Sequence, residues 1–154
     1  MTHAFLPALR STLDAHITNM SSLYGLMGVV GQTAYSSSKF AVRGFSESLR
    51  QELGPLGIGV TSVHPGGIKT NIANTARLGS GVSQQQGLAG RDTMNKVLKL
   101  PPEQTARLIL QGTQRRAPRV LVGVDATLAD SIVRLLPSSY EQVIQRLHPV
   151  PQPE

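Results

Sequence analysis

Three short apolar runs alternate with longer helical patterns along this chain, and this alternation is the strongest constraint on its fold. The runs Ile17–Met20, Gly59–Val63 and Arg119–Gly123 have the length and composition of buried strands. In the stretches between them, apolar residues recur at helical spacing. Strands that are separated by helices pair in parallel, because each connection must cross back over the sheet. The pattern predicts an α/β fold with a parallel sheet of about three strands and flanking helices.

Residues that commonly begin or end helices mark several of the expected boundaries. Thr33 is expected to be the N-cap of helix 34–53, and Gly54 its C-terminal glycine. Asp125 is expected to cap helix 125–136. The full set of expected helices is 1–13, 34–53, 102–115, 125–136 and 138–147.

The segment 71–98 is polar and rich in glycine, and it is expected to be one long loop. Loops of that length inside a domain are usually functional lids or mobile segments. The proline-rich tail 148–154 is expected to be disordered. Residues 1–147 then belong to a single domain.

The positive charge of the chain does not indicate a nucleic-acid partner. Lys and Arg number 15 against 9 Asp and Glu, which gives a net charge of +6. The basic residues are scattered apart from Arg115, Arg116 and Arg119, and no aromatic residue stands near these three. Nucleic-acid interfaces concentrate charge on one face and often add aromatic side chains for stacking. We therefore expect a mildly basic surface and no nucleic acid.

Cysteine is absent, which excludes disulfide scaffolds, thiolate metal sites and cysteine catalysis. We expect no metal site. No apolar run approaches the roughly 20 residues of a membrane span, and the first residues do not have the pattern of a signal peptide. These features predict a cytoplasmic protein without a membrane partner.

Residues with complementary chemistry follow two neighbouring strands. Tyr35 and Lys39 stand four residues apart at the start of helix 34–53, so both lie on one face. A nearby cation and the positive end of a helix both favour phenolate, which suits proton transfer. Ser22 follows the first strand, and Pro65–Thr70 follows the second. Ligands of open α/β sheets bind where the strands end, so these groups are expected to converge on one crevice.

Each of these features has a simpler explanation when it is taken alone. Tyr-x-x-x-Lys is common in helices, and Pro65-Gly66 is an ordinary turn. The glycines after the first strand do not have the spacing of a dinucleotide-binding loop. His64 is interpreted as a strand-end residue rather than a base. The functional signal lies in the combination and order of the motifs.

In that combination the chain resembles the catalytic half of a classical short-chain dehydrogenase/reductase. The motifs are Asn19-Met-Ser-Ser22, Gln32-Thr-Ala-Tyr35-Ser-Ser-Ser-Lys39 and Val63-His-Pro-Gly66 with Thr70. The resemblance extends to Gly123 and, more loosely, to Leu147. It implies part of a Rossmann-like, doubly wound parallel sheet.

The resemblance also implies the roles of the site residues. Tyr35 would be the general acid/base, and Ser22 would hydrogen-bond the reacting oxygen of a small carbonyl or alcohol substrate. Lys39, together with Tyr35, would contact the ribose of NAD or NADP and favour the phenolate. The nicotinamide end of the cofactor would be lined by Pro65, Gly66 and Thr70. Residues 71–98 would bind the substrate, and helix 34–53 would pack between the subunits of a homo-oligomer.

Several of the family's features do not occur in this chain. It has no T-G-x-x-x-G-x-G turn for the cofactor phosphates, no N-N-A-G motif and no catalytic Asn in the helix before Ser22. It is roughly a hundred residues shorter than a complete doubly wound domain. We therefore expect the C-terminal part of a longer enzyme, inactive alone, in which NAD and NADP are not distinguished. The alternative is a non-catalytic remnant that associates with other subunits through helix 34–53 and the bared edge of strand Ile17–Met20.

Overall fold

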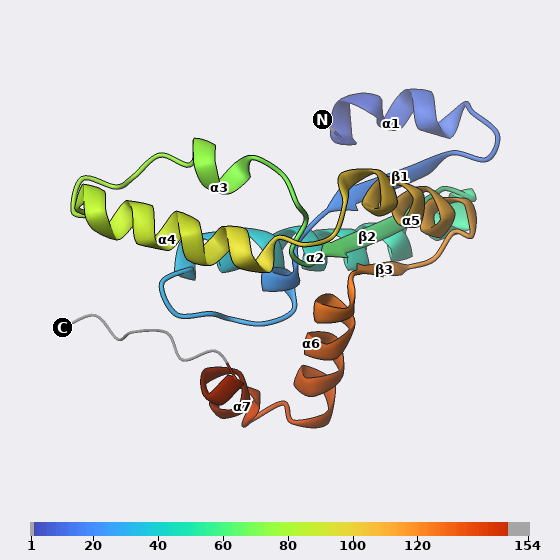
Figure 1. Ribbon diagram of the computed structural model, residues 1–154. Coiled ribbons are helices and arrows are strands. Elements are labelled where there is room, and N and C mark those ends of the chain that lie inside the picture. The colour runs from blue at the N-terminus through green and yellow to red at the C-terminus, as the bar shows by residue number, and fades with distance from the viewer. Residues whose placement is uncertain (1, 148–154) are drawn as a thin grey trace.

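The computed structural model describes residues 2–147 as a parallel sheet with helices on both faces (Figure 1). The strands lie in the order β1 (His16–Met20), β2 (Gly59–Pro65) and β3 (Arg119–Val122), and both pairs are parallel. The expected α/β class and three-stranded parallel sheet are confirmed. The tail 148–154, which the sequence predicts to be disordered, lies outside the described residues.

The helices agree with the expected ones except in the segment 71–98. They are α1 (Thr2–Arg10), α2 (Thr33–Leu53), α3 (Ile72–Thr75), α4 (Gln84–Val97), α5 (Pro102–Gln114), α6 (Val124–Leu135) and α7 (Tyr140–Leu147), with short 3₁₀ turns η1 (Leu23–Gly25) and η2 (Gly54–Leu56). The expected starts and ends differ from these bounds by a few residues.

The expected helix caps were wrong in three places. The N-cap of α2 is Gln32 rather than Thr33, and its side chain makes no capping hydrogen bond. Gly54 keeps a helical backbone because it begins η2, in which proline fits the first turn, and the left-handed residue is Gly57 with φ of 74°. Asp125 lies in the first turn of α6, whose N-cap is Gly123.

The segment 71–98 is not a loop, because it contains α3 and α4. Helix α4 begins with a capping box, in which Ser83 Oγ accepts from Gln86 N–H at 3.2 Å and the Gln86 side chain accepts from Ser83 N–H at 2.9 Å. Gly87 is the one buried residue of this helix, so no apolar stripe signals it in the sequence. In Figure 1, α3 and α4 lie together beside the sheet, away from α6.

Helices α2 and α5 cover opposite faces of the sheet. On one face, Asn19 Nδ2 donates to Ser46 Oγ of α2 at 3.0 Å. On the other, Thr18 Oγ1 lies 3.0 Å from Thr113 Oγ1 of α5. Consecutive strand residues point to opposite faces, so the two contacts fix the two layers. The connection from β1 to β2 runs through α2, and the connection from β2 to β3 runs through α5. Both move in the same direction across the sheet but pass over opposite faces. The two crossovers therefore have opposite handedness, and one is of the rare left-handed kind.

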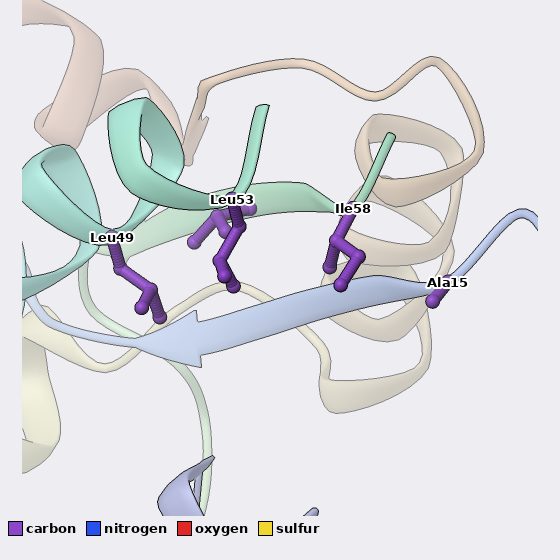
Figure 2. Close-up of a cluster of buried hydrophobic side chains, with 5 residues drawn as sticks. Ala15, Leu49, Leu53 and Ile58 are labelled. Carbon is purple, nitrogen blue, oxygen red and sulfur yellow. The ribbon is translucent and has the colours of Figure 1, made fainter. Parts of the chain in front are cut away.

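A buried apolar cluster fixes the C-terminal half of α2 against β1 and β2 (Figure 2). Each Leu, Ile or Val side chain in such a cluster stabilises the fold by about 1.5–3 kcal/mol. The cluster holds in place the helix whose first turns carry Tyr35 and Lys39. It consists of Ala15, Leu49, Leu53, Ile58 and Val60.

Strand β1 is an edge strand of the sheet that residues 2–147 form. Its residues are half-buried or exposed, and it pairs with β2 alone among the strands described. The bared edge expected from the sequence is therefore present in this part of the chain.

The basic group near β3 is largely engaged in ion pairs. Arg116 pairs with Asp14, and Arg119 pairs with Glu47 and Asp130. None of the helices within residues 2–147 combines the length and the apolar character needed to cross a bilayer.

Candidate active site

Ser22 lies just beyond the carboxyl end of β1, and hydrogen bonds to both its backbone and its side chain fix it there. Its Oγ accepts from the backbone N–H of Tyr24 at 3.2 Å, which makes Ser22 the N-cap of η1. Its carbonyl oxygen lies 3.0 Å from Nδ1 of His64. A hydroxyl has one proton to donate in addition to its acceptor sites. The bond to Tyr24 uses an acceptor site, so the proton is available to a ligand oxygen.

Tyr35 and Lys39 meet on the first turns of α2, as the spacing predicts. The Lys39 ammonium lies 5.5 Å from the centroid of the Tyr35 ring. Lys39 Nζ also donates to the carbonyl oxygen of Met20 at 3.4 Å, which ties it to the end of β1. The Tyr35 side chain is 43% exposed. The phenol is therefore accessible from solvent while a cation stands beside it.

Tyr24 links Ser22 to Tyr35, and sequence reasoning missed it. Its ring lies edge-on to that of Tyr35, with centroids 5.9 Å apart and an interplanar angle of 86°. Burial, and to a smaller degree the neighbouring Tyr35, raises the pKa of Tyr24, so it stays a neutral phenol. The only signal in the sequence was an aromatic residue two places after Ser22.

Close packing of η1 on α2 sets the distance between these groups. Ser21 Oγ donates to the Lys39 carbonyl oxygen at 2.8 Å. A methyl group at Gly25 would collide with Ser21 Oγ and with that same carbonyl. Glycine at position 25 therefore lets the segment after β1 approach the helix backbone directly.

The end of β2 lies beside the end of β1. Ser21 N–H donates to the Val63 carbonyl at 2.8 Å and continues the ladder between the two strands. Pro65 closes β2, and Gly66 N–H donates to Val122 at 2.9 Å. The structure thus brings Pro65 and Gly66 to the carboxyl end of the sheet, where Ser22, Tyr35 and Lys39 also lie.

Thr70, the last of the expected site residues along the chain, lies beyond the end of β2. It follows an isolated parallel bridge between Ile68 and Leu100, and it is exposed. Its N–H donates locally to the Ile68 carbonyl at 2.8 Å.

His64 is a completely buried residue of β2, next to its last position, as expected. A carbonyl can only accept, so Nδ1 carries the proton that bonds the Ser22 oxygen. Nε2 lies 2.8 Å from Ser62 Oγ and accepts from that hydroxyl in the neutral ring. Burial lowers the pKa of His64, although the Ser22 carbonyl opposes the shift. His64 therefore holds Ser22 in place as a neutral imidazole.

A cavity of about 420 Å³ lies next to this group, between the start of α2 and α7. Ser22, Tyr35 and Lys39 are not among its lining residues. The cavity is lined by Gly28, Val29, Thr33, Ser36, Ser37, Phe40 and Tyr140.

A parallel sheet with helices on both faces and a polar cluster at the strand ends defines an α/β protein of the doubly wound class. The sequence profile described as short chain dehydrogenase matches residues 1–80. The chain belongs to this family of oxidoreductases.

Curated relatives are similar in sequence to this chain over nearly its whole length. SadH of Mycobacterium tuberculosis, named as an oxidoreductase, is 43% identical over 145 residues, which are 93% of this chain and 52% of SadH. The dehydrogenase/reductase SDR family member 7B of Xenopus laevis is 32% identical over 94% of this chain and 43% of its own length. The chain thus spans about half the length of the curated relatives it matches.

Solved structures share the fold. A short-chain dehydrogenase from Streptomyces avermitilis is 28% identical with a TM-score of 0.68, covering 95% of this chain and 57% of the other. A short chain dehydrogenase/reductase from Burkholderia phymatum, solved in complex with NAD, gives a TM-score of 0.71 at 22% identity, covering 99% of this chain and 57% of the other.

Proposed function

We propose that this chain carries the proton-transfer part of an NAD(P)-dependent oxidoreductase that interconverts a small-molecule carbonyl and an alcohol. The observation that carries the proposal is the cluster of Ser22, Tyr35 and Lys39 at the carboxyl end of β1 in a short-chain dehydrogenase fold. In this proposal Tyr35 is the acid/base, Ser22 binds the reacting oxygen, and Lys39 contacts the cofactor ribose.

The residues present fit the nicotinamide end of such a cofactor. An ammonium group has three donors, and the contact of Lys39 with Met20 uses one of them at 3.4 Å. The other two are available to ribose hydroxyls. In this proposal the nicotinamide lies at the strand end, along Pro65 and Gly66. These features suit NAD and NADP equally.

The proposed mechanism assigns one task to each side chain. The Ser22 hydroxyl donates to the substrate oxygen and orients it. Tyr35 gives its phenolic proton to that oxygen in reduction and takes it back in oxidation. Lys39 stabilises the negative charge that develops on the Tyr35 oxygen. When bound, the nicotinamide supplies the hydride that the carbonyl carbon gains, or accepts the one that the alcohol carbon loses.

We also propose that the phosphate end of the cofactor is held by residues that this sequence does not contain. The chain has no glycine-rich turn of the dinucleotide-binding type, and such turns bind pyrophosphate at a helix N-terminus. The isolated chain is then expected to bind NAD(P) weakly and to turn over little substrate.

A second copy of the chain is the partner proposed for α2. Beyond Tyr35, the helix exposes two phenylalanines, Phe40 at 40% and Phe45 at 50%. Exposed apolar side chains on one long helix support subunit association. A non-catalytic remnant that acts through this association alone remains the competing proposal.

Replacing Tyr35 distinguishes the two proposals. NAD(P)H oxidation is measured with a panel of small aldehydes and ketones, using this chain and any longer product that its gene encodes. Tyr35→Phe is expected to lower turnover about 10²- to 10⁴-fold with little change in cofactor affinity. The control Tyr24→Phe keeps the neighbouring ring and is expected to retain most activity. In a protein with measurable turnover, an equal rate in Tyr35→Phe and the unmodified form would refute the acid/base role.

A further inference from the structure

We propose that Asp125 is a positioning residue for the turn Pro65–Gly67, and through Gly67 for the base of the α3–α4 segment. The inference rests on the proposed function in one respect only, which is that this turn lines the nicotinamide. Asp125 itself belongs to the first turn of α6, and its link to the turn joins residues 58 positions apart.

The carboxylate of Asp125 is shared between the turn and its own helix. Oδ2 accepts from Gly67 N–H at 2.6 Å, and Oδ1 accepts from Ala126 N–H at 2.9 Å. Both bonds are charge-assisted, and the positive end of α6 favours the carboxylate further. The carboxylate therefore fastens the turn after β2 to the helix after β3.

The Asp125 carboxylate lies where a side chain at either of two glycines would be. A methyl group at Gly66, or one at Gly123, would collide with the Asp125 carboxylate. Gly66 is also fixed through its own N–H, which donates to the Val122 carbonyl. The turn thus fits against α6 without room for a side chain at its centre.

Gly67 also closes the base of the α3–α4 segment. Its carbonyl oxygen accepts from the N–H groups of Lys99 and Leu100, both at 3.0 Å, and Lys69 N–H donates to Leu100 at 2.8 Å. A methyl group at Gly67 would collide with the Val97 carbonyl. The chain therefore leaves toward α3 and returns from α4 at one point beside the sheet (Figure 1).

Through these contacts Asp125 positions both the turn Pro65–Gly67 and the base of the α3–α4 segment. Asp125 accepts from the N–H of Gly67, and the residues that leave α4 donate to the carbonyl of Gly67, which belongs to the next peptide group. Because both sets of contacts fix Gly67, losing Asp125 is expected to loosen both the turn proposed to face the cofactor and the base of the α3–α4 segment. If Asp125 served only as an acidic residue in the first turn of α6, its loss would affect α6 alone.

A double-mutant cycle separates these two roles. Gly66→Ala alone is expected to destabilise the chain, because its methyl group meets the carboxylate. In the Asp125→Ala background that collision is absent, so adding Gly66→Ala lowers the free energy of unfolding by much less. Urea unfolding measures all four proteins. Thr127→Ala, which alters the same turn of α6 without touching position 66, is the matched control and gives no such relief. If the double variant lost as much unfolding free energy as Gly66→Ala and Asp125→Ala lose together, the proposal would be overturned.

Amide exchange in the chain without cofactor gives an independent readout. Asp125→Ala is expected to speed exchange at Gly67, Lys99 and Leu100 by about tenfold, the effect of losing one charge-assisted hydrogen bond. Asp125→Asn keeps one oxygen and gives an intermediate increase. The Gly67 amide proton resonance moves upfield in both variants as its carboxylate acceptor is lost. Unchanged exchange and resonance at Gly67 would overturn the proposal even if the variants were less stable.

Titration with NADH and with NADPH then tests the link to the cofactor. Asp125→Ala is expected to weaken binding of the preferred nucleotide about tenfold, and Asp125→Asn less. Unchanged affinity despite faster exchange at Gly67 would overturn the link. A longer product of the gene that binds neither nucleotide would contradict the proposed function instead, and the cycle and the exchange data would still decide the positioning role.

Discussion

The Nδ1 atom of His64 lies 3.0 Å from the backbone carbonyl oxygen of Ser22 and donates a hydrogen bond to it. His64 belongs to β2, whereas Ser22 follows β1, so the bond crosses from one strand to the end of its neighbour. The ring is completely buried, and its other nitrogen accepts from Ser62. The residue proposed to bind the substrate oxygen is thus held by a neutral imidazole.

This arrangement predicts that the free energy of unfolding falls as the pH drops below about 6.5. Burial lowers the pKa of His64, and burial followed by the charge of Arg116 lowers that of His16. Between the folded and unfolded pKa values the unfolded chain binds more protons, so stability rises with pH in that window. Above the unfolded value both states are neutral, and stability is complete. Urea unfolding between about pH 5 and pH 8 measures the dependence.

His64→Asn isolates the contribution of His64. Its amide replaces the donor near Nδ1 but does not titrate, so the variant is expected to lose about 1–2 kcal/mol near pH 7.5 and to depend less on pH below that. His3→Asn alters an exposed histidine and is the control, with an unchanged profile. Identical pH profiles for His64→Asn and the unmodified chain would show that His64 does not titrate in this way.

Arg119 of β3 joins two helices, and its loss is expected to be costly. It donates to Glu47 of α2 at 2.9 Å and to Asp130 of α6 at 3.0 Å. The Asp130 side chain is only 12% exposed, so Arg119→Met leaves it buried with a single partner, Arg134. We predict a loss of about 2–3 kcal/mol in urea unfolding. Arg134→Met removes a side chain that is 61% exposed, and is expected to cost less than about 1 kcal/mol. Equal losses would contradict the bridging role of Arg119.

The sequence predicted what depends on local spacing. Apolar periodicity located the strands and the long helix α2, and the separation of four residues placed Tyr35 and Lys39 on one face. It did not predict contacts whose partners are distant in the chain. The bond from His64 to Ser22 spans 42 positions and that from Gly67 to Asp125 spans 58, and nothing in either local pattern marks the partner.

Helix α4 was missed for a different reason, and its capping box offers a test. The helix has little apolar surface to bury, so its first turn depends on the reciprocal bonds of Ser83 and Gln86. Ser83→Ala is expected to weaken that turn by about 1 kcal/mol, seen as faster amide exchange at Gln86. Global unfolding is expected to change little, since a peripheral segment opens locally. The control Ser80→Ala precedes the box and should leave exchange at Gln86 unaltered.

Two glycines, Gly25 of η1 and Gly44 of α2, are expected to respond to alanine in opposite directions. At Gly25 the new methyl group collides with Ser21 Oγ and the Lys39 carbonyl. Because the carbonyl belongs to the helix backbone and cannot move aside, Gly25→Ala is expected to cost about 2 kcal/mol or more and to displace η1 from α2. At Gly44, inside α2, the methyl group would meet nothing within 4 Å. Gly44→Ala is therefore expected to stabilise the chain by about 0.5–1 kcal/mol in thermal or urea unfolding.

The same Gly44→Ala variant tests the proposed packing of α2 against a second copy. Open space around Gly44 within one chain is compatible with close approach by another helix, and a methyl group there would hinder that approach. Sedimentation of the unmodified chain and of the variant separates the effects. A more stable chain with weaker self-association is the result expected if α2 forms the interface at this position. A more stable chain with unchanged association would remove Gly44 from the interface, and a destabilised chain would contradict the open environment that the structure gives this residue.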